Sequence, residues 1–221
     1  MKTDVKICGL TRSEDVEFAI KHGAALLGFI VEAASKRRLN ASEAAKISAP
    51  AKGITPRVAV TVNANDSLLT RIMAEMSPEF IQCHGDESPA RVAEIARRFK
   101  VRTIKAVGVA CESDIKSSEE FVGVCDFILY DAKPPKGPQG QENAVRGGHG
   151  VSVDWTLMGR SPRPKTFALA GGLHSGNVAR AIAQTLAPIV DVSSGVESAA
   201  GIKDEAKIHA FMKAVKNGPN R

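Results

Sequence analysis

Eight segments of the chain carry the hydrophobic pattern of buried β-strands. In the first, Val5 and Ile7 alternate with Lys6 and Cys8, which is the two-residue period of a strand. Others are continuous apolar runs, such as residues 26–31, and such runs are typical of strands buried on both faces of a parallel sheet. The predicted strands are residues 5–8, 26–31, 57–62, 80–85, 103–107, 127–131, 166–170 and 189–194.

A segment with helical periodicity follows each predicted strand. The clearest examples are residues 67–76 and 204–216, whose apolar side chains recur at a spacing of three or four. Ser13 and Asn40 are the predicted N-caps of the first two helices, and Ser88-Pro89 marks the start of the fourth. The other predicted helices cover residues 41–47, 112–120, 155–158 and 177–186.

Eight alternating strand and helix segments predict an α/β protein with a single-domain (β/α)₈ TIM barrel over residues 1–221. A doubly wound parallel sheet is the alternative, but it seldom needs eight strands in so short a chain. One stretch breaks the rhythm: residues 132–151 are rich in Gly and Pro and show no periodicity. A loop of this length in a compact domain is typically functional or mobile.

Composition and charge indicate which kinds of partner the protein binds. The formal net charge is +6, from 30 basic and 24 acidic residues, and with only one Trp and one Tyr the sequence favours a small anionic substrate over nucleic acid. No apolar run is long enough to cross a membrane, and Met1-Lys2-Thr3-Asp4 leads straight into a strand, so we expect a cytoplasmic protein without a membrane partner. We also expect a monomer. The four cysteines are widely spaced and predict neither a zinc site nor a disulfide framework.

In such a barrel the carboxyl ends of the strands surround one site. The side chains and turns predicted there are Cys8, Arg37, Asn63, His84, Lys105, Asp131, Gly171-Gly172 and Ser193-Ser194-Gly195. The two small-residue turns follow the seventh and eighth strands. Small residues let backbone N–H groups approach an anion, and this is the usual phosphate-binding position of the fold. Gly171, Gly172, Ser193, Ser194 and Gly195 are therefore predicted to bind a phosphate group.

Each remaining candidate allows two interpretations. Cys8 is either a base or nucleophile, or a small core residue. Asp131 ends an apolar strand and is either a proton donor or the partner of Lys105 or Lys133. Lys105 itself is either a Schiff-base residue of a lyase or a counter-ion. The two other candidates are Arg37, which could clamp a carboxylate or be a solvated base, and His84, which by itself is more typical of a hydrogen-bonded structural residue.

Several motifs together resemble one family. Lys6-Ile7-Cys8-Gly9-Leu10-Thr11 is similar to the N-terminal signature of the phosphoribosylanthranilate isomerases of tryptophan biosynthesis. The resemblance continues in the family's order over nearly the whole chain, through the loop from Ser35 to Arg37 and four further motifs: Gln82-Cys83-His84-Gly85-Asp86-Glu87, Leu129-Tyr130-Asp131, Ala170-Gly171-Gly172-Leu173 with Asn177-Val178, and Asp191-Val192-Ser193-Ser194-Gly195-Val196-Glu197.

The resemblance implies an Amadori rearrangement of an aminoaldose to an aminoketose, in which one acid and one base suffice without metal or redox cofactor. Carried over by motif, Asp131 is the acid, Cys8 the base, Arg37 the anthranilate-carboxylate clamp and His84 a substrate-binding residue. Two loops depart from the family pattern. Lys36 replaces the usual Pro, which leaves Arg38 as an alternative clamp, and residues 147–150 read Gly-Gly-His-Gly instead of Gly-Gly-Thr-Gly.

Overall fold

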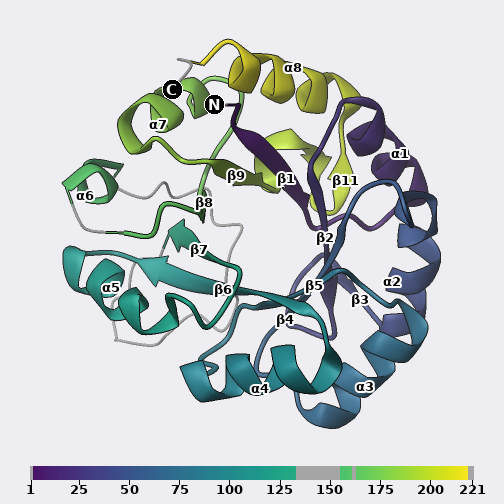
Figure 1. Cartoon of the computed structure of the whole chain (residues 1–221). Helices are drawn as coiled ribbons and strands as arrows, with labels where there is room; N and C mark the ends of the chain where they lie inside the picture. Colours follow the sequence, from purple (N-terminus) through teal and green to yellow (C-terminus); the bar gives the residue numbers. More distant parts are fainter. Residues whose placement is uncertain (1, 133–154, 161–162, 219–221) are drawn as a thin grey trace, which may run out of the picture.

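In a computed structural model of the chain, residues 2–132, 155–160 and 163–218 are described. Eight parallel strands form the central sheet (Figure 1). They are β1 (Asp4–Cys8), β2 (Leu26–Val31), β4 (Arg57–Thr61), β5 (Phe80–Cys83), β6 (Arg102–Val109), β7 (Phe127–Ala132), β8 (Phe167–Leu169) and β9 (Ile189–Val192). Because β1 pairs in parallel with both β2 and β9, the sheet closes on itself, and the predicted TIM barrel is confirmed.

Helices surround the barrel (Figure 1). They are α1 (Ser13–Lys21), α2 (Ala41–Ser48), α3 (Asp66–Glu75), α4 (Pro89–Phe99), α5 (Glu112–Ser117), α6 (Trp155–Arg160), α7 (Val178–Thr185) and α8 (Glu205–Lys216). Short 3₁₀ helices are η1 (Ala49–Ala51), η2 (Ser118–Phe121) and η3 (Ser194–Val196). Among the described residues, none of the helices has the length and apolar character needed to cross a lipid bilayer.

The helix starts follow local chemistry, with one correction. Asn40 caps α2 in a reciprocal pair with Glu43, and Ser88 caps α4, as predicted. Ser13 is not the N-cap of α1: it is the first helical residue, and the N-cap Arg12 makes no side-chain cap. Arg12 instead donates hydrogen bonds to the buried carboxylate of Asp15, which stabilises this helix start in another way.

Three further features differ from the predicted elements. The loop after β2 contains a two-residue strand, β3 (Arg38–Leu39), which pairs in parallel with β2. A hairpin of β10 (Glu197–Ala199) and β11 (Ile202–Lys203) follows η3. The helix predicted over residues 112–120 ends at Ser117 and continues as η2. Elements of two or three residues are too short to show a period, so the hydrophobic pattern could not reveal them.

Apolar side chains form two cores, one inside the barrel and one between strands and helices. Strand alternation sends even-numbered positions inward on β1, and the inner core contains Cys8, Val58, Ile104 and Leu129 among its members. The outer core packs the other strand face against the helices, with Ile7, Ile81 and Tyr130 fully buried. This alternation also decides which polar side chains at the strand ends face the barrel axis.

Candidate active site

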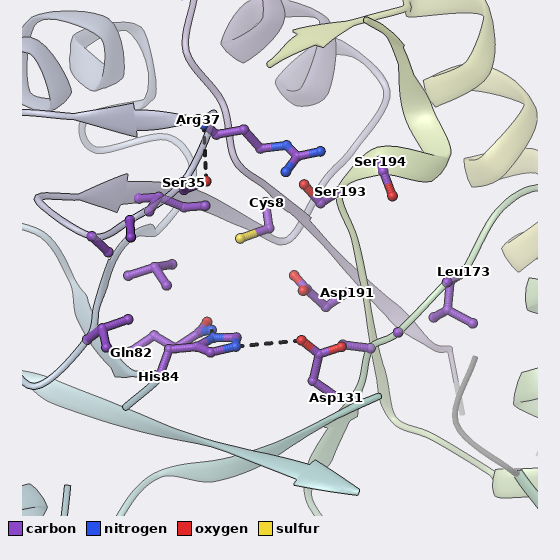
Figure 2. Close-up of a pocket in the computed structure, with 18 residues that line it drawn as sticks. Cys8, Ser35, Arg37, Gln82, His84, Asp131, Leu173, Asp191, Ser193 and Ser194 are labelled. Atoms are coloured by element: carbon purple, nitrogen blue, oxygen red, sulfur yellow. Dashed lines mark hydrogen bonds and ion pairs between the residues drawn. The ribbon is translucent and has the colours of Figure 1, made fainter. Parts of the chain in front are cut away.

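The pocket that contains most of the predicted site residues opens at the carboxyl ends of the strands (Figure 2). Its cavity volume is about 130 Å³. The residues that line it are Cys8, Ile30, Ala33, Ala34, Ser35, Arg37, Val60, Val62, Gln82, His84, Asp131, Ala170, Gly171, Gly172, Leu173, Asp191, Ser193 and Ser194. The structure thus brings the predicted acid, base, clamp and phosphate turns into one pocket.

Cys8 lies at the end of β1 and is 7% exposed, with its free thiol in the pocket wall. Burial raises the pKa of this thiol, because a thiolate loses its hydration in the barrel. The positive charges of Lys6 and Lys203 act in the opposite direction, and the negative charge of Asp191 adds to the rise. Burial therefore dominates the ionisation of Cys8, and the charges around it modify that effect.

Asp131 is the penultimate residue of β7, and β8 and β9 separate that strand from β1, so Asp131 and Cys8 stand on different walls of the pocket. Its Oδ2 is 3.6 Å from Nε2 of His84, and Nδ1 of the same ring is 2.8 Å from Nε2 of Gln82 (Figure 2). Gln82 and His84 are two residues apart, so both face inward, as their alternation predicts. His84 is oriented between an amide and the carboxylate that it adjoins.

The guanidinium of Arg37 lies in the pocket wall and is oriented by the β10–β11 hairpin. Nε and Nη2 each donate to one carboxylate oxygen of Glu197 at 2.7 Å, and Lys203 Nζ donates to the same carboxylate at 2.7 Å. Hydrogen bonding to Glu197 raises the pKa of Arg37. Burial opposes ionisation of Glu197, but its bonds to Arg37 and the charge of Lys203 hold its pKa below the usual value. Within the described part of the chain Nη1 of Arg37 makes no hydrogen bond, so that edge remains for a ligand.

The two small-residue turns meet on the wall of the pocket next to Asp191. Gly171 and Gly172 have φ angles of +88° and +61°, a left-handed backbone that favours glycine, and a Cβ at Gly171 would lie 2.7 Å from the Ala132 amide nitrogen. Asn177 donates to the carbonyl of Gly172 at 3.0 Å and fixes this turn. Ser193 and Ser194 line the pocket from the other turn.

Gly195, unlike the other four residues of the predicted phosphate turns, does not line the pocket. A Cβ at this position would be 2.0 Å from the Leu173 carbonyl oxygen, so glycine is needed here because two loops pack closely. Arg38 also lies outside the pocket, 59% exposed and paired with Glu32, which leaves Arg37 as the clamp candidate. The departures at residues 147–150, and the possible partner Lys133, lie outside the described residues.

Lys105 and Asn63 do not line the pocket. Asn63 follows the end of β4, but Lys105 lies in the middle of β6 and not at a strand end as predicted. Lys105 Nζ lies 2.9 Å from Glu87 Oε2 and donates to the Gly85 carbonyl at 2.6 Å. Glu87 in turn accepts from the backbone amides of Asn63 and Gly85. This ion pair makes Lys105 a counter-ion of Glu87, not of Asp131, and removes the basis for a Schiff-base role.

Sequence reasoning did not single out four charged residues around the pocket: Lys6, Asp191, Glu197 and Lys203. Lys6, Asp191 and Glu197 belong to the motifs quoted for the family, which is the available signal for them, whereas Lys203 lies in none of those motifs. The partners of these residues lie far away in the chain: Lys6 and Asp191 are 185 positions apart, and Arg37 and Glu197 are 160 positions apart. Among the described residues, no group of three His, Cys, Asp or Glu side chains is placed to hold a metal ion.

A closed parallel barrel with a polar pocket at its strand ends and glycine- and serine-rich turns after β8 and β9 defines the class of (β/α)₈-barrel enzymes. A family model described as N-(5'phosphoribosyl)anthranilate (PRA) isomerase matches residues 5–214. The chain belongs to this N-(5'-phosphoribosyl)anthranilate isomerase family. The predicted family resemblance is confirmed, and with it the prediction of an isomerase.

Relatives and solved structures agree with this assignment. The N-(5'-phosphoribosyl)anthranilate isomerase of Rhizobium meliloti is 41% identical over 98% of both chains. The crystal structure of phosphoribosyl anthranilate isomerase from Thermotoga maritima has a TM-score of 0.81 and 33% identity, covering 97% of this chain and 98% of that one. A structure of phosphoribosyl anthranilate isomerase in complex with reduced 1-(O-carboxyphenylamino)-1-deoxyribulose 5-phosphate has a TM-score of 0.79 and 32% identity, with the same coverage.

Proposed function

We propose that the protein converts N-(5'-phosphoribosyl)anthranilate to 1-(2-carboxyphenylamino)-1-deoxyribulose 5-phosphate, in tryptophan biosynthesis, by general acid and base catalysis without a cofactor. The observation that carries the proposal is the placement of a thiol and a carboxylate, Cys8 and Asp131, on different walls of one pocket. That pocket also holds a guanidinium and the two small-residue turns. The pocket thus offers a binding group for an anion at each end and an acid and a base between them. This arrangement matches a substrate that carries a carboxylate and a phosphate.

Ring opening is the first step of the proposed reaction. The bond between the anomeric carbon and the ring oxygen breaks, the nitrogen lone pair forms a C=N bond, and the ring oxygen takes up a proton. We assign Asp131 as the donor, because its carboxyl group lies in the pocket wall near the carboxyl end of β7. His84 lies 3.6 Å from the carboxylate and, held by Gln82, fixes its orientation and contacts the sugar.

Proton abstraction is the second step. The Cys8 thiolate takes the proton from the second sugar carbon, and the electron pair of that C–H bond forms a C=C bond as the iminium nitrogen becomes neutral. The resulting enol tautomerises to the ketone. Over the turnover one proton is donated and one accepted, so acid and base are both restored by exchange with solvent.

Binding uses the two ends of the pocket. Arg37 presents its Nη1 edge, which Glu197 leaves unoccupied, to the anthranilate carboxylate. The turns with Gly171, Gly172, Ser193 and Ser194 hold the phosphate through backbone N–H groups. Apolar side chains between these ends suit the aromatic ring: Ile30, Ala33, Val60 and Val62. Held in this way, the sugar lies between the acid and the base, which turns proton transfer into an intramolecular event.

The test is a fluorescence assay that follows the loss of phosphoribosylanthranilate when purified protein is added. We expect turnover that inorganic phosphate inhibits competitively, because phosphate occupies the turns of β8 and β9. Borohydride should trap no covalent adduct, whereas a lyase acting through Lys105 would be inactivated. A folded protein that does not consume the substrate would refute the proposal and leave a phosphate-binding barrel without this activity.

A further inference from the structure

A buried ammonium group lies directly beneath Cys8. Lys6 is two residues before Cys8 on β1, so both side chains point into the barrel. Lys6 is 0% exposed and does not line the pocket, whereas Cys8 does. Lys6 therefore cannot contact a ligand bound in the pocket, and anything it contributes to the reaction must act through a neighbouring residue.

The ammonium of Lys6 is hydrogen-bonded to one residue of the pocket wall and lies close to another. Lys6 Nζ donates to Asp191 Oδ1 at 2.8 Å, across the junction of β1 and β9. A Cβ at Gly28 of β2 would lie 2.8 Å from Cys8 Sγ and 3.1 Å from Lys6 Nζ, which puts sulfur and ammonium within about 6 Å of each other. The missing side chain at Gly28 leaves the space in which these two groups meet. Lys6 also interacts with Cys8 through charge and hydrogen bonding.

The charges that face Cys8 come from each neighbouring element. Lys6 is on β1, Asp191 on β9 and Lys203 on β11, and the charge of Arg37, in the loop between β2 and β3, also interacts with Cys8. Arg37 and Lys203 share the carboxylate of Glu197, which partly neutralises them. Of the cations that act on the sulfur, Lys6 has the strongest effect.

The proposed base must be a thiolate before it can accept a proton, and burial opposes that form. We propose that Lys6 is a positioning residue that provides the counter-charge for the Cys8 thiolate, and that Asp191 controls how much of this charge reaches the sulfur. When Cys8 accepts the substrate proton, a neutral S–H forms and the ammonium is left paired with Asp191 alone. The inference rests on the proposed role of Cys8 as the base.

Burial opposes the charged form of Lys6 too, but the charges of Asp191 and Cys8 raise the pKa of its ammonium above the usual value. The charged form of the lysine is therefore favoured, which is what the proposed counter-charge requires. A purely structural Lys6–Asp191 pair would stabilise the barrel without changing the reactivity of the Cys8 thiol. The reactivity of the thiol therefore distinguishes a structural pair from the proposed counter-charge.

The test measures the rate of iodoacetamide alkylation at Cys8 against pH, with the modified residue identified by mass spectrometry. Lys6→Met should lower the rate at pH 7 by roughly tenfold or more and move the pH midpoint upward, because an opposite charge at this range favours the thiolate. Asp191→Asn should do the reverse, since it removes the negative charge and keeps the ammonium. The matched control is Lys105→Met, which removes another buried strand lysine far from Cys8 and should leave the profile unchanged.

Two results would overturn the inference: a folded Lys6→Met protein with the wild-type alkylation profile, or an Asp191→Asn profile displaced toward higher pH. If Lys6→Met does not fold, the direction of the Asp191→Asn shift decides alone. The readout is independent of the isomerase assay. An inactive wild-type protein whose thiol still responds to Lys6 would refute the proposed function and leave the counter-charge standing, and an active enzyme with an unresponsive thiol would do the opposite.

Discussion

Two of the buried lysine–carboxylate pairs, both anchored on barrel strands, are alike in geometry and differ in their surroundings. Lys6 and Asp191 are 2.8 Å apart, and Lys105 and Glu87 are 2.9 Å apart, with both lysines almost fully buried. Lys6 faces the barrel axis beneath Cys8. Lys105 faces outward, where it donates to the carbonyls of the loop after β5 and lies 5.6 Å from the centre of the Phe121 ring.

The comparison indicates that the role of a buried charge depends on which face of the strand carries it. Inward-facing charges gather around the pocket and change the reactivity of the groups in it. Outward-facing charges tie strands to loops: Arg57 of β4 does this as well, donating to the carbonyls of Met76 and Ser77 and pairing with Glu79. Substitutions on the inner face should therefore alter kinetics, and those on the outer face should alter stability.

The strongest test of the inner face is loss of the acid or the base. Cys8→Ser and Asp131→Asn should each lower kcat by about 10²–10⁴-fold with little change in KM, because each keeps the shape and removes the group that exchanges a proton. Both variants should unfold at nearly the wild-type temperature. Steady-state kinetics beside a thermal melt measure the two effects, and a Cys8→Ser enzyme with near wild-type kcat would falsify the base assignment.

On the outer face, Lys105→Met should lower the stability of the protein strongly and change its kinetics little. Breaking a buried ion pair by removing one partner costs about 3–5 kcal/mol, because the carboxylate of Glu87 remains buried without its counter-ion. Denaturant unfolding should show this loss, while kcat/KM of the folded enzyme at low temperature stays within a few-fold of wild type. A kinetic collapse without destabilisation would contradict the division between the two faces.

An intermediate effect is expected at the rim of the pocket. Arg37→Ala should raise KM and lower kcat, together about 10- to 100-fold in kcat/KM, because a charged hydrogen bond that binds and positions the substrate is lost. Arg38→Ala is the matched control, since that side chain is exposed and pairs with Glu32. If Arg38→Ala were crippled and Arg37→Ala normal, the carboxylate clamp would be Arg38.

The smallest effect concerns pH and the outer pair of Arg57 and Glu79. Burial opposes ionisation of Glu79, but hydrogen bonds from Arg57 lower the pKa of Glu79 below its ordinary value. A depressed folded-state pKa adds stability above the ordinary glutamate range, and that stability is lost as the pH falls through the folded-state pKa. Glu79→Gln should therefore melt below wild type at pH 7, by no more than about 2–4 °C since solvent screens this partly exposed group. The difference in melting temperature between Glu79→Gln and wild type should disappear in acid. Thermal melts at several pH values measure this difference, and a difference that does not change with pH would contradict the role of the pair.

Much of the barrel follows from the hydrophobic pattern. All eight strands lie where the apolar runs place them, because a strand buried on both faces requires such a run. The caps at Asn40 and Ser88 follow from local hydrogen bonding. The pattern does not show which side chains of a nearly all-apolar strand face the barrel axis and which face the helices. Residues 103–107 allow either phase for Lys105, and only the register with β5 settles it, since Gln82 faces inward and pairs with Ile104.

The motifs and the strand ends together predict the site: Cys8, Arg37, His84, Asp131 and the two turns line one pocket, whereas Gly195, Asn63 and Lys105 do not. The supporting charges were beyond reach for a physical reason. Glu197, Lys203 and Asp191 act on residues of the first strands, and no local rule relates side chains more than 150 positions apart. The hairpin that holds Glu197 and Lys203 is also too short to have a periodicity of its own.

The pairing of β1 with β9 has a consequence for the newly made chain. Lys6 leaves the ribosome early, and its partner Asp191 follows 185 residues later, which at about 5–20 residues per second is a delay of roughly ten to forty seconds. Until β9 arrives, the first strand has β2 on one side and an unpaired edge on the other. The barrel can close, and the thiol can meet its surrounding charges, only after β9 has been synthesised. A nascent chain that carries Cys8 and Asp131 but lacks β9 is thus expected to be catalytically silent.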